Sequence, residues 1–490
     1  MPSLKPALEL LNNGAKNLNK AINKPIQGTI KNQKKFKTLT FYNLSDGINK
    51  LQLTDSCNLL KNRKLKLGEV IKINNYSLSD NPKFNEIITN NDTVIEITGP
   101  IDENDFPFKP KEKKTLKLLR DLPQYKFQSE YLSNLLRFRS LIETSLINYL
   151  SKEGLIKVAP PLITENDCED GGETFQISTS ASKNFFKPTS GSNKKNDKQT
   201  PPKLPNLTVS TQLHLEIMAQ ALQKVYTMTP CFRSEKSQTN RHLCEFWMLE
   251  VEMGYIDSVL DLCEFSEKMI KEVVKILLTE NKGLELISEY EPLESNEDKK
   301  DLSNIKRSDL LLQKWKNLYA VKWEVLEYGD AISLLQENIK QGIIQFENDN
   351  IKWGDELQTE HEKWLTSVYY KKPVFVINYP KVCKPFYMKQ NKDSMNRDIV
   401  NNFDLLFPEI GEIIGGSLRE DDYAVLVQEM EDRKMDVSTL KWYTDLRKNG
   451  SIPHGGFGLG FERLIVYLYG LKNIKDAIPF YRSYKSSLKI

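Results

Sequence analysis

Hydrophobic positions repeat with a helical period at two places in this chain of 490 residues. The first is residues 131–150, where one predicted face carries Leu135, Phe138, Ile142, Leu146 and Tyr149. Spacings of three and four residues are typical of an amphipathic helix with one buried face. The pattern ends at Gly154, and a predicted strand over 155–159 then runs into two prolines. A second amphipathic helix is predicted over 259–278.

Short alternating segments separated by turns occupy residues 25–108. Strands are predicted near 37–43, 51–53, 68–73 and 94–99, a spacing that favours a small antiparallel β-barrel. Lysines are frequent here, and Phe36, Phe41 and Tyr42 could stack on nucleic-acid bases. The same aromatic residues could equally fill the core of the barrel, and the pattern leaves both possibilities open.

The remaining organisation follows from composition. Residues 109–130 contain a proline- and lysine-rich stretch and are predicted to be a linker. Residues 131–490 are then the second domain, with strands and helices mixed. Residues 187–206 are rich in Ser, Asn, Lys and Pro and are expected to be a low-complexity surface insertion. Helical patterns alternate with charged loops over 290–370, and no chemistry is assigned there.

The N-terminus is basic and amphipathic. Residues 1–37 contain eight lysines and one acid, Glu9, and apolar positions recur at helical spacing from Leu4 to Ile22. This composition favours a mitochondrial targeting segment over residues 1–24, and hence the mitochondrial matrix. The alternative is a basic arm that contacts nucleic acid in a cytoplasmic protein, which the absence of arginine favours.

Composition excludes several classes of protein. No apolar run approaches the roughly 20 residues that a membrane-spanning helix needs, so we expect no membrane partner. The six cysteines form no C-x-x-C pair, and there are only four histidines, which leaves little material for a zinc site. The formal net charge is only +3, so any site for a polyanion must be a local patch.

The segment 225–254 contains the densest group of candidate functional residues. Two strand-like runs flank a polar loop, which predicts a long hairpin. On the second run Phe246, Met248, Glu250 and Glu252 share one face, and the alternate residues form a core face. Together with Arg233 and Glu235 on the first run, this face could hold a nucleotide by guanidinium, ring and carboxylate. A surface ladder of ion pairs is the alternative.

Two further segments carry candidate chemistry. In the segment 454–463, Gly456, Gly458 and Gly460 alternate on one face of a predicted strand, so that a flat ligand could approach the backbone. Glu462 and Arg463 then open a helix, whose amide end favours phosphate. The glycine spacing matches neither a P-loop nor a dinucleotide fingerprint.

In the segment 411–420, Glu412 is a candidate Mg²⁺ ligand and Arg419 could grip a carboxylate. Strict alternation would place these two residues on opposite faces of a strand. A bulge at Gly415–Gly416 is therefore expected.

Together these segments, in this order, resemble the signature motifs of the class II aminoacyl-tRNA synthetases, aspartate-like subgroup. The resemblance covers nearly the whole chain. It implies an α+β fold, in which an N-terminal oligonucleotide-binding β-barrel (25–108) contacts the tRNA anticodon. A class II catalytic domain built on an antiparallel sheet flanked by helices follows and receives the acceptor end. The family also implies a homodimer through the segment 131–161.

The resemblance implies roles for individual residues. Arg233, Arg463 and Glu412 would act in catalysis, with Glu412 also holding Mg²⁺ as the metal ligand. The expected ATP-binding residues are Arg233, Glu235, Arg241, His242, Phe246, Glu412, Gly460 and Arg463. The expected amino-acid-binding residues are Glu169, Gln212, Leu215, Glu250 and Arg419. The cofactors implied are ATP, as a substrate, and Mg²⁺. The amino acid would form an adenylate and then pass to the 3′-OH of the terminal adenosine of the tRNA.

Three features favour asparagine as the amino acid. The segment 164–175 resembles the asparagine-type members of the subgroup, and so does His361, for which the sequence offers no role. Leu215 stands where the aspartate-type members place a lysine, and a desolvated carboxylate needs that cation whereas an amide does not.

The alternatives are an aspartate enzyme, including one that charges two tRNAs, and a tRNA-independent asparagine synthetase. A catalytically silent nucleic-acid-binding paralogue is a further possibility.

Overall fold

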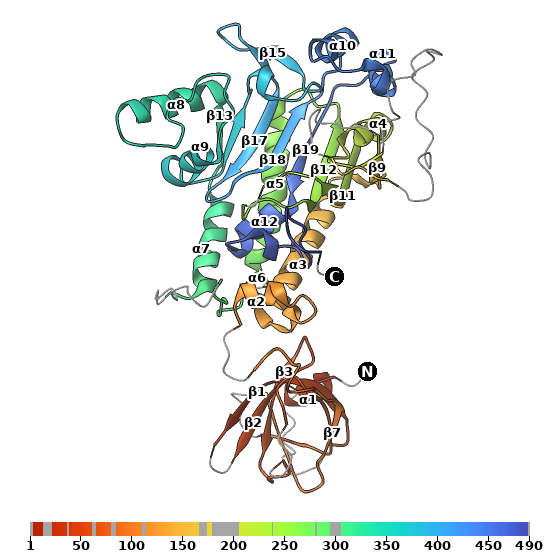
Figure 1. The fold of residues 1–490 in the computed structure, drawn as a ribbon, viewed down its shortest axis with the longest axis vertical. Helices are drawn as coiled ribbons and strands as arrows, with labels where there is room; N and C mark the ends of the chain where they lie inside the picture. Colours follow the sequence, from red (N-terminus) through yellow and green to blue (C-terminus); the bar gives the residue numbers. More distant parts are fainter. Residues whose placement is uncertain are drawn as a thin grey trace. The chain divides into compact units, whose positions relative to one another are not determined.

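The computed structural model describes residues 3–12, 22–36, 39–60, 65–79, 85–109, 114–165, 174–178, 205–237, 239–279, 282–294 and 305–488. The chain divides into two compact units, Met1–Leu118 with Pro292–Lys299, and Leu119–Glu291 with Lys300–Ile490 (Figure 1). The predicted linker 109–130 contains helix α2 (Leu116–Asp121) and the 3₁₀ turn η1 (Lys126–Gln128). Among the helices of the described residues, none combines the length and hydropathy that crossing a bilayer requires.

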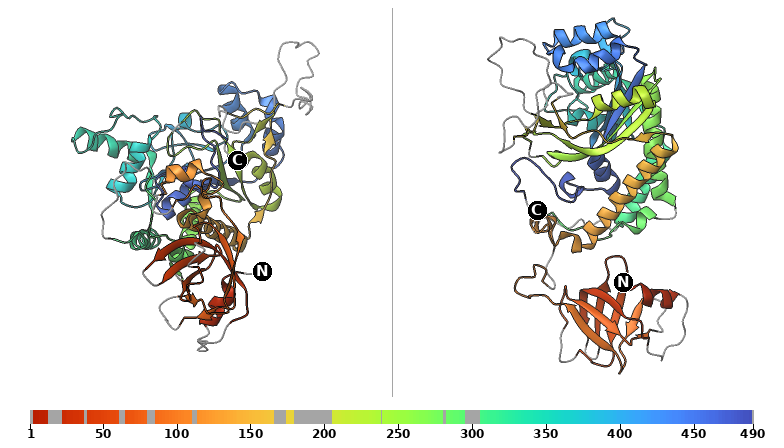
Figure 2. Two further views of the ribbon diagram at one scale, coloured as in Figure 1. Left: turned by 60° about the horizontal axis from the view of Figure 1, so that its bottom comes forward. Right: turned by 90° about the vertical axis from the view of Figure 1, so that its right-hand side faces the viewer.

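The first unit is a curled seven-stranded sheet with the strand order β5-β6-β3-β2-β1-β4-β7 (Figure 2). Its strands are β1 (Ile26–Lys35), β2 (Thr40–Ser45), β3 (Lys50–Asp55), β4 (Val70–Asn74), β5 (Ser77–Leu78), β6 (Glu86–Ile88) and β7 (Val94–Gly99). The predicted antiparallel pairing holds for every pair except β3 with β6, which is parallel. Sequence analysis missed β1, β5 and β6.

The core of this unit answers the question that the aromatic residues left open. Tyr42 is buried among Ile26, Ile30 and Leu53, so it cannot stack on a base. Phe36 is exposed and packs edge-on against Phe41, with ring centroids 5.6 Å apart. Those two rings remain available at the surface.

The predicted N-terminal helix is α1 (Lys5–Asn12), and it belongs to this unit. Leu4 and Ala7 have no exposed surface and lie in the same core cluster as β1 and β2. The Leu4 amide donates to Asp46 Oδ2 at 2.9 Å, which fixes the start of the helix. The apolar face of α1 is therefore covered by the sheet.

The second unit is built on an eight-stranded sheet with the order β13-β14-β17-β18-β19-β12-β11-β8. Its strands are β8 (Ile156–Lys157), β11 (Lys224–Phe232), β12 (Glu245–Gly254), β13 (Glu324–Glu327), β14 (Val374–Ile377), β17 (Asn402–Phe407), β18 (Gly411–Leu418) and β19 (His454–Gly460). Only the two edge pairs, β13 with β14 and β8 with β11, are parallel. The antiparallel interior is the one that the resemblance implies.

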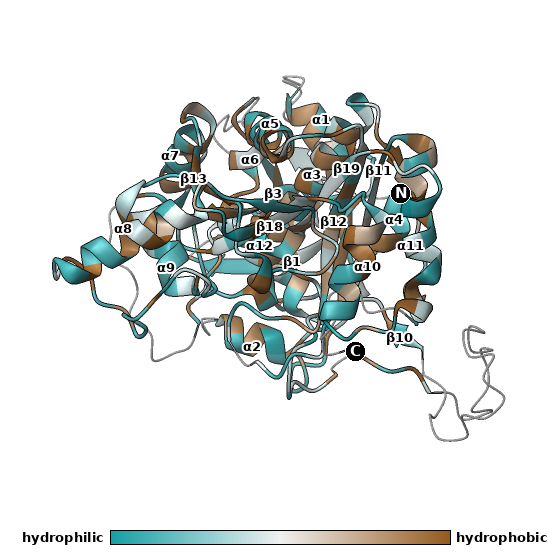
Figure 3. Ribbon diagram, turned by 90° about the horizontal axis from the view of Figure 1, so that it is seen from above, coloured by the Kyte–Doolittle hydropathy of each residue, from teal (hydrophilic) through white to brown (hydrophobic). Residues whose placement is uncertain are grey.

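Helices cover one face of this sheet. Helix α5 (Val259–Leu278) packs against β17, β18 and β19, and α3 (Glu130–Lys152) packs against α5 (Figure 2, right). Both helices agree with the hydrophobic pattern, and four of the five predicted stripe residues of α3 are buried. Helix α8 (Tyr328–Lys340) lies against β13 and β14, and hydrophobic positions alternate with hydrophilic ones along it (Figure 3). The site lies on the opposite face, where α4 (Gln212–Leu222) packs against β11 and β12.

Candidate active site

A first cavity of about 290 Å³ opens on the face of the sheet opposite α5. The hairpin β11–β12 forms one wall, in the predicted antiparallel pairing that runs from Lys224 opposite Met253 to Phe232 opposite Glu245. The end of β19, the start of helix α12 (Phe461–Tyr469) and β18 supply the rest. The residues proposed from the sequence for ATP all line it: Arg233, Glu235, Arg241, His242, Phe246, Glu412, Gly460 and Arg463.

Arg233 follows β11 directly, and its guanidinium lies over the ring of Phe246 at 5.6 Å from the centroid. Its Nη1 is 4.0 Å from Glu235 Oε1, and both side chains are partly exposed. A guanidinium, an aromatic face and a carboxylate therefore reach one cavity from neighbouring strands. That combination suits a phosphate, a planar base and an exocyclic amino group.

The loop between the two strands brings two more groups. His242 Nδ1 lies 2.6 Å from Thr239 Oγ1, and Nε2 lies 3.7 Å from Glu235 Oε2. Burial lowers the pKa of His242, which favours the neutral ring. Arg241 Nη2 donates to the Glu409 carbonyl at 3.1 Å, and this guanidinium lines both the first cavity and a third cavity of about 400 Å³.

Arg463 enters from the first turn of α12. Its Nη1 donates to the Glu412 carbonyl at 2.8 Å and lies 3.7 Å from Glu412 Oε2. The three glycines on one face of β19 have two different roles. Gly458 and Gly460 line the cavity, whereas Gly456 is packed so tightly that an added Cβ would lie 2.1 Å from the Val251 carbonyl. Gly456 therefore serves strand packing and does not line the cavity.

A second cavity of about 400 Å³ adjoins the first, and Arg233, Met248, Glu412 and Gly458 line both. It contains the predicted amino-acid residues Gln212, Leu215, Glu250 and Arg419. The predicted face of β12 points into these cavities. However, Glu250 and Glu252 are buried and do not lie on the open surface that the alternation suggested.

Glu412 and Arg419 both reach the second cavity because β18 contains a bulge. Leu405 pairs with Ile414 and Leu406 pairs with Glu412, so the extra residue is Ile413. The bulge that strict alternation required is present, but the expected position at Gly415–Gly416 was wrong. The glycines are needed for another reason, since a Cβ on Gly416 would lie 2.5 Å from the Phe403 ring.

Arg419 is buried and already paired. Its Nε and Nη2 donate to Glu252 at 3.1 and 2.9 Å, and its Nη1 donates to Ser417 Oγ at 2.7 Å. Burial opposes its charge, but Glu252 more than offsets this and raises the pKa of Arg419. Sequence analysis suggested that Arg419 could bind a carboxylate. An arginine whose charge is shared in this way is poorly suited to that and is better suited to binding a neutral acceptor.

Glu250 is held at the floor of the second cavity. The Thr211 amide donates to it at 3.0 Å, and the Ser210 and Thr211 hydroxyls also donate. Burial raises its pKa despite these bonds. Gln212 and Leu215 lie in helix α4 (Gln212–Leu222). Leu215 packs with Ala219 and Val225, so no cation occupies its position.

Sequence analysis missed four charged residues near these cavities. Lys384 and Asp404 line the second cavity and pair at 2.6 Å. Glu356 lines it as well. Glu362, in helix α9 (Thr359–Lys363), lies in the third cavity and accepts from the Glu412 amide at 3.3 Å. Burial and then the carboxylates of Glu412 and Asp404 raise the pKa of Glu362 to about 7.

His361 has a structural task. Its Nδ1 accepts from the Gln358 amide at 3.1 Å, and its Nε2 lies 3.3 Å from the Asn348 carbonyl. The ring therefore caps α9 and fixes the helix that carries Glu362. The segment 354–362 around the histidine also contains Glu356 and Glu362, five residues before and one residue after His361, so it held a signal for these two acids.

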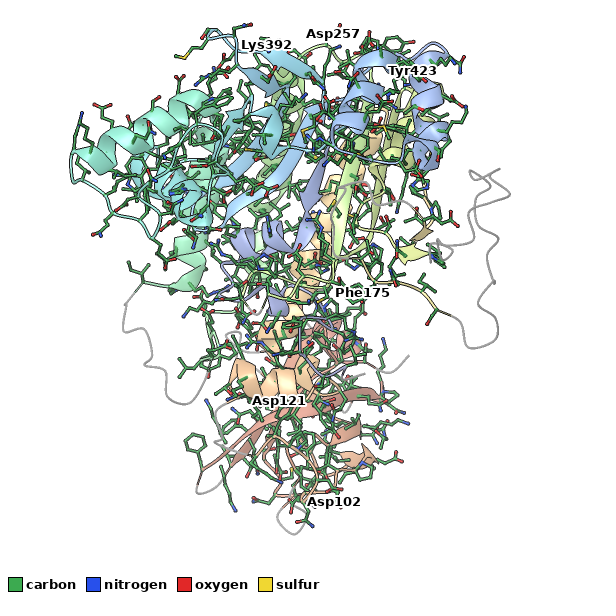
Figure 4. The ribbon with its side chains drawn as sticks, turned by 45° about the horizontal axis from the view of Figure 1, so that its top comes forward. Asp102, Asp121, Phe175, Asp257, Lys392 and Tyr423 are labelled. Atoms are coloured by element: carbon green, nitrogen blue, oxygen red, sulfur yellow. The ribbon has the colours of Figure 1, made fainter. Side chains whose placement is uncertain are left out.

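Glu169 falls among residues 166–173, outside the described part of the chain, and so does most of the expected insertion 187–206. The neighbouring backbone is described. Phe175 accepts from the Leu207 amide at 2.9 Å, and its side chain is labelled in Figure 4. This places the segment after residue 173 beside β10 (Asn206–Leu207), which precedes α4.

Two carboxylates offer a site for Mg²⁺. A Cβ on Gly415 would lie 3.1 Å from Glu412 Oε1 and 3.6 Å from Asp404 Oδ1, so both oxygens face one small space. No group of three or more His, Cys, Asp or Glu in the described residues could hold a metal ion by itself. Mg²⁺ is commonly held by one or two carboxylates together with substrate phosphates, and these two residues fit that pattern.

Comparison with known proteins agrees with this geometry. The model of the family "tRNA synthetases class II (D, K and N)" matches residues 119–483. A mitochondrial asparagine–tRNA ligase of Saccharomyces cerevisiae is 45% identical over 94% of this chain and 92% of its own length. A Dictyostelium discoideum protein, "Probable asparagine--tRNA ligase, mitochondrial", is 37% identical over 93% and 92%.

Among solved structures, asparaginyl-tRNA synthetase of Pyrococcus horikoshii complexed with asparaginyl-adenylate superposes with a TM-score of 0.77. It is 27% identical and covers 96% of this chain and 97% of its own. The similarity spans both units, and the family model covers the cavities described above. This chain therefore belongs to the class II tRNA synthetases of the aspartate, lysine and asparagine family.

Proposed function

We propose that this protein is an asparagine–tRNA ligase, which joins L-asparagine to tRNA(Asn) through an asparaginyl-adenylate. The observation that carries the choice of amino acid is the charge of the second cavity. Its lining holds five acids (Glu250, Glu252, Glu356, Asp404 and Glu412) and three cations (Arg233, Lys384 and Arg419). A substrate with a second carboxylate would add negative charge to a buried site that already has a surplus of it.

The individual cations support the same choice. Arg419 is paired with Glu252, and Lys384 is paired with Asp404. Leu215 adds no charge. An amide loses only its hydration on entering, and carboxylate and guanidinium groups can restore its hydrogen bonds. This surplus of acids also attracts the ammonium group of the amino acid.

The chemistry follows from the junction of the two cavities. ATP would occupy the first cavity, with its base beside Phe246 and its phosphates near Arg233 and Arg463. The asparagine carboxylate would attack the α-phosphorus, and pyrophosphate would leave toward Arg241 in the third cavity. Arg233, which lines the first two cavities, would stabilise the charge that develops. Mg²⁺, held by Glu412 and Asp404, would neutralise phosphate charge. The 3′-OH of the tRNA would then attack the carbonyl of the adenylate and take the asparaginyl group, and AMP would leave.

Partners and compartment belong to the same proposal. The first unit would contact the anticodon, with the exposed ring of Phe36 and the half-buried ring of Phe41 beside it. A homodimer would form through 131–161, where Ile156 in the edge strand β8 is 45% exposed. The basic N-terminus favours the mitochondrial matrix, and two relatives are described as mitochondrial.

ATP–pyrophosphate exchange with asparagine and with aspartate, each with and without tRNA, tests the choice of amino acid. We expect exchange with asparagine in the absence of tRNA, and a preference in kcat/KM over aspartate on the order of 10³-fold or more, because the polar groups of the site would be mismatched. Equal activation of the two amino acids would contradict the proposal. A chain that exchanges with neither would be the silent paralogue.

A further inference from the structure

A buried polar network lies behind the second cavity and includes Arg419. Its members come from α4, β12, β18, β19 and helix α11 (Lys441–Lys448), and they are far apart in the sequence. We call them the Glu216 network: Glu216, Glu252, Arg419, Tyr443, Arg447 and His454. All six side chains are buried. Of these residues only Glu252 and Arg419 line the cavity itself.

Glu216 is the centre of this network and has no exposed surface. Tyr443 Oη donates to it at 2.9 Å, Gln212 Nε2 donates at 3.1 Å, and Arg447 pairs with it directly. Its Oε1 also lies 3.9 Å from Arg419 Nε. Arg447 is the largest favourable influence that holds the pKa of Glu216 far below its usual range, against the cost of burial. The residue is a carboxylate anion.

The charges of the network balance in pairs. Glu252 neutralises Arg419, and Glu216 neutralises Arg447. His454 lies with Nδ1 2.7 Å from the Ile452 carbonyl and Nε2 3.1 Å from Glu216 Oε2. Among the described residues, Glu216 is the one carboxylate that contacts both Arg447 and His454. Without it, one uncompensated cation would lie directly behind the guanidinium that faces the substrate.

We infer that Glu216 is a positioning residue that sets the preference for an amide over a carboxylate. It does so without touching the substrate, by cancelling the charge of Arg447. Arg419 then presents to the cavity a guanidinium whose charge is already shared with Glu252. Glu216 together with Leu215 thus keeps this wall of the cavity from attracting an anionic side chain. The inference rests on the proposed function, since it concerns how that site chooses its amino acid.

The test is Glu216→Gln, which keeps the size of the side chain and an oxygen that can accept from Tyr443 and Arg447. It leaves one positive charge in surplus near the cavity. We expect the ratio of kcat/KM for asparagine to that for aspartate to fall by about tenfold or more, because a buried unit charge at this range acts strongly in a low dielectric. The KM for ATP should not change.

Glu429→Gln is the matched control. Glu429 is also a buried glutamate between two cations, Lys381 Nζ at 2.5 Å and Arg433 Nε at 2.6 Å, but it lines none of the three cavities. We expect it to leave the ratio unchanged. A purely structural role for Glu216 would lower activity with both amino acids equally, and an unchanged ratio in Glu216→Gln overturns the inference.

A second pair of variants separates charge from shape. Glu216→Gln combined with Arg447→Gln removes one charge of each sign, so the ratio should return toward that of the unaltered enzyme. If Glu216→Gln does not fold, Arg447→Gln alone decides the matter. It leaves surplus negative charge, so the ratio should rise, and no change overturns the inference. Failure of the proposed function is distinct, because the unaltered enzyme would then show no preference for asparagine.

Discussion

Arg233 and Arg463 reach the first cavity from different elements, one after β11 and the other in the first turn of α12. Neither is buried: Arg233 lies 4.0 Å from Glu235 and Arg463 lies 3.7 Å from Glu412. Both guanidinium groups are therefore partly exposed at the cavity, where a ligand can reach them. By contrast, Arg419 is buried and forms an ion pair with Glu252.

We expect Arg233→Ala and Arg463→Ala each to abolish adenylation almost completely. Loss of one donor that stabilises transition-state charge typically costs about 2.7–4 kcal/mol, or roughly 10²–10³ in rate. The rate of ATP–pyrophosphate exchange measures the loss of adenylation in each variant. Arg397→Ala is the control, since Arg397 pairs with Asp393 and lines none of the three cavities. Near-normal exchange in both site variants would show that ATP binds elsewhere.

At the scale of residues, sequence analysis placed the groups that recur in short motifs and missed those whose partners are distant. Lys384 pairs with Asp404 across 20 positions, and Glu216 meets Arg447 across 231. No local pattern encodes such a pairing. Glu362 was missed because its role depends on α9 lying beside the first residues of β18, which only the fold establishes.

At the scale of elements, strong hydrophobic periodicity was sufficient to predict a helix or a hairpin correctly. The helix predicted over 259–278 coincides with α5, and the hairpin 225–254 has the predicted pairing. Weak signals failed for physical reasons. β13 is a four-residue edge strand in which Val325 is 43% exposed, so it shows little hydrophobic pattern. The position of the bulge at Ile413 is set by the pairing of β18 with β17. The prediction rested on the glycines alone and therefore placed the bulge two residues too late.

Helix α1 gives an element-scale prediction, because its buried residues are part of the core of the first unit. We expect Leu4→Ala to lower the free energy of unfolding of this unit by about 2–5 kcal/mol, the usual cost of truncating a buried leucine. Hydrogen exchange at the amides of β1 and β2 would report this unit separately from the second. Ile48→Ala is the control, since Ile48 is 85% exposed and should change stability by less than about 0.5 kcal/mol.

If Leu4→Ala leaves the exchange of these amides unchanged, α1 does not stabilise the sheet. The result also bears on the N-terminus as a whole. Leu4 and Ala7 belong to the apolar face expected of an import signal and also pack on the sheet, so these two residues would serve both tasks at different times.

At the scale of the whole molecule, the last prediction concerns compartment. A fusion of residues 1–30 to a reporter should enter mitochondria, since this segment is basic, contains one acid and has apolar residues at helical spacing. Fluorescence microscopy with a matrix marker would measure it. Replacing Lys16, Lys20 and Lys24 by glutamate should abolish import, because import signals of this kind are poor in acids. Because Leu4 and Ala7 are buried once the first unit folds, the full chain should be imported before that unit is complete. A diffuse cytosolic signal from both the fusion and the full-length protein would rule out the mitochondrial assignment and leave the basic segment as an arm for nucleic acid.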